Sequence, residues 1–371
     1  MSERHGLGTR TRRKIRVTAL LASTVALAAV LSACSSSGST PSAGGSPNGD
    51  KPETSDITVT FGTNTASTAP LWLAADEGIF AKHGLNVKVV EATSTVGATA
   101  VVGGGSQFFL GEAASAFAAV AQGRPIQIIG MLQDFNNQKF YVRPEITDPS
   151  QLKGKSIAIS ANGDSTDLSV RSALEHFGLS ASDVTLLATG GSSNRIASLI
   201  SGKVAGTVLS EPTATKAGQQ GMKLLYDMTV QPFPSGGITI SKDFGDKNPN
   251  TVLAFMESIE EGLKFLTDPA NKDECLKVIA KYQATKVDDP AVLAGYNQYS
   301  GSVLAKDPYP NQQAGDNMVN AFKSLDPKLY GSLSTAKVYN TKFGDELRSS
   351  DFLQNLWGSA LTASPSASAS S

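Results

Sequence analysis

The chain is poor in the residues on which most catalytic and metal sites depend. It has three histidines and two cysteines among 371 residues, and His5 lies in the basic segment at its start. It contains no His-Glu-x-x-His pattern, no Cys or His cluster with metal-ligand spacing, no Gly-x-x-x-x-Gly-Lys-Ser/Thr phosphate loop and no Gly-x-Ser-x-Gly turn. We therefore expect no catalytic residue, no metal and no cofactor.

The chain also lacks an apolar run long enough to span a membrane. Its apolar stretch from Val17 to Leu31 has about 15 residues, fewer than the ~20 that cross a bilayer. Basic residues, among them Arg12, Arg13 and Lys14, come before this stretch, and small residues follow it. A basic start, a short apolar region and a small-residue end are typical of a secretory signal peptide, which we predict over residues 1–33.

The end of this segment, Leu31-Ser32-Ala33-Cys34, resembles the bacterial lipobox. The resemblance implies cleavage before Cys34 and diacylation of its thiol with palmitate-type chains. The protein would then be held at the extracytoplasmic face of the cell membrane. A plain secretory cleavage with Cys34 incidental remains an alternative, and so does a retained helix. The Arg12-Arg13 pair loosely resembles a twin-arginine signal, so the export route stays open.

Without this leader the chain has an excess of acidic residues. Removing residues 1–33 takes six basic residues and one acidic residue from totals of 32 and 33, which leaves a net charge of about −6. Nucleic-acid binding depends on Lys and Arg at phosphates, so this balance does not favour it. With Cys34 lipidated, Cys275 has no partner, and stability has to come from an ordinary core rather than from disulfides.

Two stretches lack the apolar residues that build a core. Residues 35–55 consist almost entirely of Ser, Gly, Thr, Pro, Asn and Asp, and residues 362–371 consist mostly of Ser and Ala. We predict a disordered tether over residues 34–55 and a disordered tail over residues 362–371. The segment between them is large enough for a core divided into two lobes.

This folded segment alternates strands and helices. Period-two alternation in Ile57–Phe61 predicts a strand, and Pro70 suits the first turn of the helix that follows. The alternation restarts after Leu152-Lys153-Gly154-Lys155, and from residue 250 onward the pattern is helical. Such alternation is typical of mostly parallel sheets covered by helices, so we predict an α/β fold with two lobes. Lobe 1 should comprise residues 56–143 and 237–361, and lobe 2 residues 144–236.

Several motifs, in the same order along the chain, resemble those of ABC-transporter solute-binding proteins. The subgroup is the one that handles nitrate, sulfonates, taurine and thiamine-type pyrimidine precursors. The motifs are Ala69–Phe80 with His83–Val87, Gly123–Ile126, Gln151–Ala158, Gly178-Leu179 with Asp183–Thr185, and Gly202–Gly206 leading to Glu211-Pro212. The chain departs from the pattern at Gln107 and Ala205, where the family often has Asp. These departures weaken assignment to a named subfamily.

The resemblance implies a type II periplasmic-binding-protein fold with a hinge between the lobes. It implies a monomer that binds a small organic solute, closes its cleft and delivers the solute to ABC permease subunits with a cytoplasmic ATPase. It implies no enzymatic activity. Two alternatives stay open, namely an enzyme of the same fold that acts on a small heterocyclic or organic substrate, and an anchored ligand sensor.

Polar loops that follow the predicted strands are the candidate binding site. In open α/β sheets ligands bind beyond the carboxyl ends of the strands, where helices begin. The predicted ligand-binding residues are Asn64, Thr65, Trp72, Glu112 and Asp134 in the first lobe and Ser165, Ser192 and Glu211 in the second. Helix capping is the alternative role for the hydroxyl and acidic residues among them.

The charges in these loops favour a neutral or amine-bearing solute. Glu112, Asp134, Asp164 and Glu211 lie there, while Arg195 is the only nearby cation. We expect Glu211 to be the main acceptor for an amine. Aromatic residues that would stack on a heteroaromatic ring are Trp72, Phe109 and Phe135, with core packing as the alternative for Trp72 and Phe109.

Overall fold

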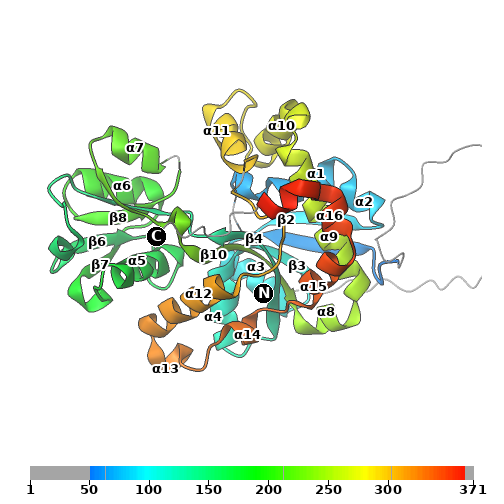
Figure 1. The fold of residues 1–371 in the computed structure, drawn as a ribbon, viewed down its shortest axis with the longest axis horizontal. Coiled ribbons are helices and arrows are strands. Elements are labelled where there is room, and N and C mark those ends of the chain that lie inside the picture. Colours follow the sequence, from blue (N-terminus) through cyan, green and yellow to red (C-terminus); the bar gives the residue numbers. More distant parts are fainter. Residues whose placement is uncertain (1–50, 63, 212, 302, 364–371) are drawn as a thin grey trace, which may run out of the picture. The chain divides into compact units, whose positions relative to one another are not determined.

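The computed structural model describes residues 51–62, 64–211, 213–301 and 303–363 (Figure 1). The predicted signal peptide, Cys34 and most of the predicted tether and tail lie outside these residues. Among the described helices, none combines the length and the apolar character needed to cross a membrane.

The first lobe is built on a sheet with the strand order β2-β1-β3-β10-β4. Its strands are β1 (Asp56–Phe61), β2 (Asn86–Glu91), β3 (Phe108–Glu112), β4 (Ile126–Phe135) and β10 (Pro232–Ser241). β1 pairs in parallel with β2 and β3, and β10 lies antiparallel between β3 and β4. Four strands therefore run in one direction and β10 runs against them.

The second lobe repeats this plan with the order β7-β6-β8-β5-β9. Its strands are β5 (Lys139–Val142), β6 (Ser156–Ile159), β7 (Thr185–Ala188), β8 (Gly206–Leu209) and β9 (Lys223–Asp227). β6 is parallel to β7 and β8, whereas β5 is antiparallel to β8 and β9. The predicted architecture, two α/β lobes with mostly parallel sheets, is confirmed.

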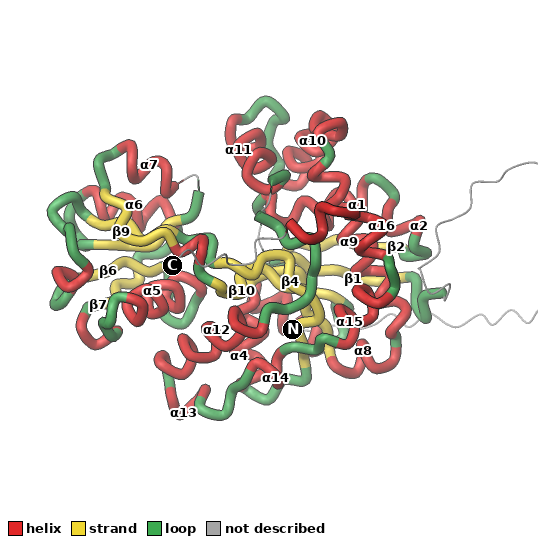
Figure 2. Tube along the Cα trace, in the orientation of Figure 1, coloured by secondary structure: helices red, strands yellow, loops and turns green. Residues whose placement is uncertain are grey.

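The chain crosses between the two sheets at residues 136–138 and 228–231, where β4 leads to β5 and β9 leads to β10 (Figure 2). These crossings lie before the predicted boundaries at 143/144 and 236/237. The difference arises because Phe140–Val142 pairs with β8 and β9 of the second sheet, not with the first. A short apolar strand fits the core of either lobe, so its residues do not reveal which sheet it joins.

Within the described residues, thirteen helices of the first lobe surround its sheet. They are α1 (Ala69–Asp76), α2 (Ile79–Lys82), α3 (Ser94–Val102), α4 (Ala113–Ala121), α8 (Lys242–Lys247), α9 (Pro249–Thr267), α10 (Lys272–Tyr282), α11 (Pro290–Tyr299), α12 (Gln312–Leu325), α13 (Pro327–Tyr330), α14 (Thr335–Val338), α15 (Lys342–Ser349) and α16 (Phe352–Trp357). One hydrophobic cluster joins β1 to α1 and α9, and another joins β4 to α4 and α12. The C-terminal helices therefore pack on the first sheet.

Helix α9 shows how sequence sets this packing. Pro249 suits its first turn, and an apolar stripe that includes Phe255, Ile259 and Leu263 is fully buried. At Gly262, a Cβ atom would lie 2.2 Å from the carbonyl oxygen of Pro70 in α1. Glycine is required there because the two helices approach too closely for a side chain.

The second lobe has helices α5 (Ser165–His176), α6 (Ser192–Ile200) and α7 (Thr213–Gln219). Asp164 caps α5 by accepting hydrogen bonds from the backbone nitrogens of Thr166 and Asp167. Separate apolar clusters lie on the two faces of its sheet, one against α5 and the other against α6 and α7. Both faces are thus covered, as a mostly parallel sheet requires.

Strand β4 lies at the edge of the first sheet, and other segments of the chain cover this edge. The backbone nitrogen of Ala305 donates to Leu132 O at 2.9 Å, and that of Met131 donates to Pro308 O at 2.7 Å. The nitrogen of Asn340 donates to Ile128 O at 2.9 Å. Covering an edge strand satisfies its backbone groups, and here it also holds the segment after α11 against the sheet.

Residues 51–55 belong to the fold and not to the tether. Glu53 accepts hydrogen bonds from the backbone nitrogens of Asn250 (3.0 Å) and Thr251 (2.8 Å), and thereby caps α9. The polar composition of the segment predicted disorder, but its bonding partners lie almost 200 positions away in the sequence. The predicted tail also begins too early, because the last 3-10 helix runs from Gly358 to Ala363.

Candidate ligand-binding site

A cavity of about 770 Å³ is lined by both lobes and by the first crossing. The first lobe contributes the short 3-10 turn before α1, the ends of β3 and β4, the first half of β10 and one side of α11. The second lobe contributes the loops that lead into α5, α6 and α7. These loops follow β6, β7 and β8, so the cavity lies where the fold type places ligands.

Five of the eight predicted ligand-binding residues line this cavity, and they are Thr65, Glu112, Ser165, Ser192 and Glu211. Glu112 ends β3, Ser165 and Ser192 begin α5 and α6, and Glu211 follows β8. Residues that are far apart in the sequence are thus brought to one cavity. Their role in binding a solute stays a prediction.

Trp72 belongs to the hydrophobic core and not to the cavity. Its side chain is fully buried, stacks on Tyr282 with ring centroids 5.0 Å apart, and meets Phe61 edge-on at 5.6 Å. The prediction that it contacts a ligand is wrong because α1 turns this side chain toward α10. Its position near the start of a helix gave no sign of which face it occupies.

Asn64 and Asp134 also do not line the cavity. Asn64 is exposed, and its side-chain nitrogen donates to Glu91 Oε2 at 3.3 Å and to Tyr282 O at 3.2 Å. Asp134 is buried, and desolvation raises its pKa to about 7. Leu132 and Gln133 line the cavity from the end of β4, whereas Asp134 lies outside it, near Asn311 and Asp307.

The other two aromatic residues do not offer a stacking surface in the cavity. Phe109 is fully buried, and its ring lies so close to Gly111 that a Cβ atom there would meet it at 2.2 Å. Phe135 is partly buried and is not among the residues that line the cavity. Phe109 is therefore a core residue, as the alternative prediction held.

Glu211 is already paired within the protein. Its Oε1 accepts from Nζ of Lys139 at 2.9 Å, and its Oε2 accepts from the backbone nitrogen and the hydroxyl of Thr215 at 3.0 and 2.7 Å. Burial opposes ionisation, but the hydrogen bonds from Thr215 and Lys139 lower the pKa of Glu211. The expectation that Arg195 is the only nearby cation is wrong, because Lys139 is 72 positions from Glu211 and reaches it from β5.

Arg195 is a buried cation at the cavity wall. Its guanidinium donates only to neutral acceptors in the described residues, namely Gly190 O at 3.0 Å, Val208 O at 3.3 Å and Ser192 Oγ at 3.2 Å. Burial lowers its pKa, and the charge of Asp164 acts in the opposite direction. Its positive charge therefore lies beside the cavity without a carboxylate bonded to it.

Glu112 is the carboxylate with the fewest bonds at the cavity, as far as the described residues go. Its Oε1 accepts from Ser165 Oγ across the two lobes at 3.3 Å, which is long for a hydrogen bond. Burial raises the pKa of Glu112, and the charge of Asp164 raises it further. Asp164 itself is occupied, since it caps α5 and also accepts from the hydroxyls of Thr166 and Ser160.

The two lobes present different surfaces to the cavity. The second lobe and the first crossing contribute polar residues and a glycine only, from Asn136 to Thr215 along the described chain. The first lobe adds apolar side chains, which are Ala66, Leu110, Ala114, Leu132, Phe233, Pro234, Ala291, Ala294, Leu304 and Met318. The wall from the second lobe is therefore polar, whereas the wall from the first lobe combines apolar side chains with polar ones such as Glu112 and Gln133.

Sequence reasoning missed the contribution of α11 and of the first crossing. Ala291, Ala294 and Gln298 line the cavity from a C-terminal helix that follows no strand, so the rule of strand ends did not point to them. In the first crossing, Gln138 is buried and its Oε1 has no hydrogen-bond partner among the described residues. The run of amides Asn136-Asn137-Gln138 was the signal available for this part of the wall.

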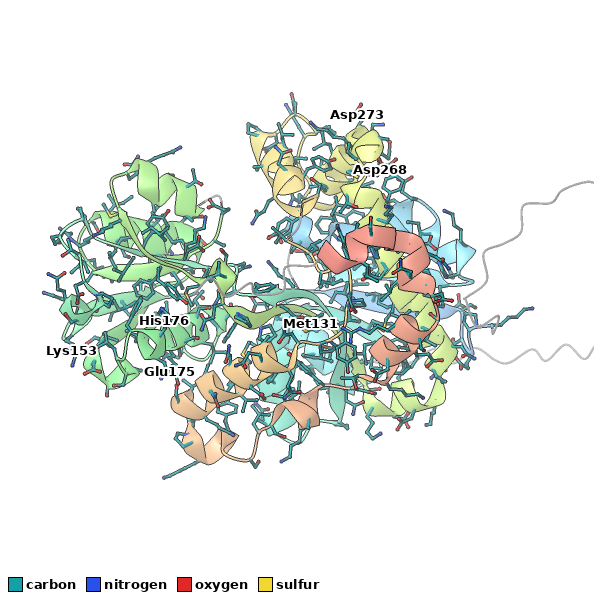
Figure 3. All side chains as sticks on the ribbon, viewed as in Figure 1. Met131, Lys153, Glu175, His176, Asp268 and Asp273 are labelled. Atoms are coloured by element: carbon teal, nitrogen blue, oxygen red, sulfur yellow. The ribbon has the colours of Figure 1, made fainter. Side chains whose placement is uncertain are left out.

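Neither histidine nor cysteine lines the cavity in the part of the chain that the structure describes. Cys275 is buried, and desolvation raises its pKa to about 12. His83 is buried between Glu257 and Glu261 rather than exposed. His176 lies on the second lobe, as do Glu175 and Lys153, whereas Met131 lies within the first lobe (Figure 3). Among the described residues, no group of His, Cys, Asp and Glu is arranged to hold a metal ion.

Comparison with known proteins identifies the family. The family model described as NMT1/THI5 like matches residues 65–272, which is more than half of the chain. The chain belongs to this family. The match begins at the first predicted ligand-binding loop and ends in α10, and it therefore includes both crossings and most of the residues that line the cavity.

Relatives of the NMT1/THI5-like chain include named solute-binding proteins. The nitrate/nitrite binding protein NrtA of Synechococcus elongatus is 27% identical over 322 residues, which cover 75% of this chain and 72% of that protein. The periplasmic aliphatic sulphonate binding protein SsuA of Escherichia coli is 15% identical, with a TM-score of 0.64 and coverage of 78% of this chain and 94% of that chain.

The periplasmic nitrate-binding protein NrtA of Synechocystis PCC 6803 has the same fold. It is 17% identical, with a TM-score of 0.60 and coverage of 85% of this chain and 93% of that chain. These likenesses confirm the predicted periplasmic-binding-protein fold and the resemblance to proteins that bind nitrate or sulphonates. All three relatives are named as binding proteins, in agreement with the prediction that this NMT1/THI5-like chain is not an enzyme.

Proposed function

We propose that the protein is a lipid-anchored, extracytoplasmic solute-binding protein that delivers a small organic solute to an ABC importer. The observation that carries this proposal is the cavity, whose wall is shared between the two lobes and the segment that joins them. A solute that contacts both walls favours the closed state, because it gains bonds there that neither lobe provides alone. Delivery then follows from reopening of the cleft at the permease.

The contacts between the lobes support a closure in which α5 stays attached to the first lobe while the opposite side of the cavity narrows. One face of α5 is attached to the first lobe and the crossings. Leu168 packs in the first lobe's hydrophobic cluster, Ser169 Oγ accepts from Asn136 Nδ2 at 3.0 Å, and Ser172 Oγ accepts from Gln231 Nε2 at 2.6 Å. On the other side of the cavity, α6 and α7 face α11 across the space a solute would fill. We infer that these helices approach each other on closure.

The charges support a solute with an acidic group. Arg195 has no bonded carboxylate among the described residues, and the N-terminus of α6 lies beside it at Ser192. A guanidinium and a helix N-terminus together favour an anionic group. The apolar wall of the first lobe suits the carbon part of such a solute, so an organic acid fits this cavity better than an inorganic ion. Nitrate and sulphonate are the ligands in the names of the relatives.

The anchor is supported by the lipobox resemblance at Cys34 and by the shortened tether. Because Glu53 and Thr54 are bonded to α9, the proposed tether would be shortened to residues 34–50. A chain of this length behaves as a random coil with a root-mean-square reach of about 20 Å. The folded lobes would therefore stay close to the membrane surface, where a permease is found.

The proposal is tested by analysis of the solute that co-purifies with the protein. The protein is purified without added ligands, denatured, and its released small molecules are identified by mass spectrometry. We expect one small organic acid in near-stoichiometric amount, which rebinds to the emptied protein with a Kd on the order of micromolar. Absence of any bound or rebinding solute would contradict the function.

A further inference from the structure

We propose that the cavity selects solutes that carry a hydrogen-bond donor, an amine or a hydroxyl, and that Glu112 and Gln138 are the residues that impose this requirement. This inference rests on the proposed function, because it names the class of solute that the same cavity takes. The solute's donor would bond to the first lobe at Glu112 and to the first crossing at Gln138. The requirement follows from which polar groups of the cavity already have partners.

Both cations at the cavity already bond to the protein. Arg195 donates to two carbonyl oxygens and a hydroxyl. The ammonium of Lys139 donates to Glu211. These bonds use three of the five N–H donors of Arg195 and one of the three of Lys139, so both cations still offer charge and further donors to an acidic group. They bind the acid and do not explain a need for a donor on the solute.

Two of the other carboxylates are also satisfied. Asp164 accepts from the backbone nitrogens of Thr166 and Asp167 at 2.9 and 3.0 Å. Glu211 accepts from Lys139 and twice from Thr215. Neither side chain needs a solute to complete its hydrogen bonds, which removes Asp164 and Glu211 as the groups that select for a donor.

Glu112 and Gln138 are acceptors that lack a good donor. Glu112 has one bond in the described residues, the 3.3 Å contact from Ser165 Oγ, although an ionised carboxylate accepts several. Gln138 is 7% exposed, and its Oε1 has no partner there, while its Nε2 donates to Asn137 Oδ1 at 3.1 Å. Both side chains line the same cavity.

Closure of the cleft would make this shortage costly. Gln138 Oε1 is already removed from water and lacks a partner among the described residues. Closure would also remove water from the Glu112 carboxylate, which costs more than the burial of an amide oxygen. A solute with an amine or a hydroxyl restores the lost bonds. A solute without a donor binds only if Glu112 takes up a proton, since repulsion between a carboxylate and an acidic solute otherwise opposes closure.

The test uses matched pairs of small acids that differ only in a donor. The pairs are acetate and glycine, propionate and lactate, and ethanesulfonate and 2-aminoethanesulfonate. The affinity of the solute released from the purified protein is measured in the same way. Each compound is titrated calorimetrically onto the emptied full-length protein, onto Glu112→Gln and onto Glu260→Gln. Glu260 is fully buried in α9 outside the cavity, so it controls for the same chemical change elsewhere in the first lobe.

We expect the released solute to carry a donor and the donor-bearing member of a pair to bind more tightly than its partner. Glu112→Gln should weaken the released solute roughly 10- to 150-fold, as for loss of a hydrogen bond to a charged group, and Glu260→Gln should leave its affinity unchanged. Gln138→Leu should also reduce the difference in affinity between the donor-bearing acid and the plain acid of each pair. This variant gives a second readout if Glu112→Gln folds poorly.

The selectivity proposal is overturned if the released solute has no donor, or if Glu112→Gln binds it as tightly as the unaltered protein. It is also overturned if the plain acids bind as well as their amino and hydroxy derivatives. These results leave the proposed function in place, because a solute is still bound. If no solute is released and none of the compounds binds, the proposed function itself fails, and the selectivity proposal fails with it.

Discussion

At the scale of single residues, the position of a side chain in the sequence does not reveal its partners. Glu211 follows a strand and precedes a helix, as a ligand-binding residue would, but Lys139 neutralises it from another strand. Trp72 lies near the start of α1 and is buried against Tyr282. Thr65, Glu112, Ser165 and Ser192 line one cavity because strand ends fix the backbone there, and their contact with a solute stays a prediction.

Replacement of Trp72 by alanine tests its assignment to the core. We expect the free energy of unfolding to fall by about 3–5 kcal/mol, because a large buried side chain leaves a cavity that α1 and α10 cannot fill. Urea denaturation of the purified protein measures the loss. Affinity for the co-purified solute, measured below the denaturation range, should not change. Loss of affinity for the solute with an unaltered free energy of unfolding would show that Trp72 belongs to the binding site and not to the core.

Removal of the Glu260 carboxylate tests the effect of pH on stability. Desolvation raises the pKa of Glu260 to about 8, and Trp357 Nε1 donates to its Oε2 at 3.1 Å. Between pH 5 and 6.5 the folded state therefore holds a proton that the unfolded state releases, so stability falls as pH rises. His83 contributes little to the slope in this window, since its pKa is raised to about 9 from an ordinary value near 6.5.

In the Glu260→Gln variant this proton is absent. The slope of unfolding free energy against pH should become less negative by up to about 1.4 kcal/mol per pH unit. Asp134, whose pKa burial raises to about 7, accounts for part of the remaining slope. Urea titrations at several pH values between 5 and 6.5 measure the difference. Parallel pH profiles for the two proteins would show that Glu260 is ionised in the folded state.

At the scale of elements, the sequence predicted strands and helices well but not their neighbours. Period-two alternation located β1, and the helical pattern from residue 250 onward located the region of α9 and α12. The sheet that Phe140–Val142 joins depends on contacts with β8 and β9, which no local pattern records. Helix α3 went unnoticed because Thr, Val and Gly are poor helix formers, so its packing on β3 decides its structure.

Helix α9 depends on a cap from outside the helix. Asn248 precedes it without a side-chain cap, and Glu53 bonds its first backbone nitrogens instead. Glu53→Ala should therefore lower the free energy of unfolding by about 0.5–2 kcal/mol, the range measured for helix caps. Lys51→Ala is the matched control, since Lys51 is exposed and precedes the same segment. Equal stability of the two variants would show that residues 51–55 are not held to α9.

Spin labels on paired helices test the side from which the cleft closes. One pair joins α7 to α11 at Lys216 and Leu293, and the other joins α5 to α12 at Glu175 and Ser324. All four residues are exposed. On addition of the co-purified solute, the first distance should shorten and the second should stay constant, because α5 is bonded to the first lobe. A shift in both distances would contradict a pivot at α5.

At the scale of the whole molecule, the fold was predictable because many weak motifs occur in one order across both lobes. The match of the family model to residues 65–272 covers the same region. Gln107, which departs from the family pattern, serves the scaffold, because its Oε1 accepts from the backbone nitrogen of Thr58 at 2.8 Å. The solute was not predictable, since the charges that select it are set by pairs such as Lys139 and Glu211.

Anchoring is a property of the whole protein and is tested at Cys34. Cys34→Ala should move the protein from the membrane fraction to the medium and leave its fold unchanged, because the first described contacts with the core are made by residues 52–54. Immunoblots of cell fractions and circular dichroism of the released protein measure both effects. A membrane-bound, uncleaved alanine variant would show that the lipobox prediction is wrong.

The central claim is that one solute bonds to both lobes. The most direct measurement is calorimetric titration of the co-purified solute onto the emptied protein and onto two variants, Glu112→Gln in the first lobe and Ser192→Ala in the second. We predict a Kd on the order of micromolar for the unaltered protein and weaker binding in both variants, each of which remains folded. Unchanged affinity in both variants would contradict the claim, because the solute would then bind outside the cavity that the two lobes share.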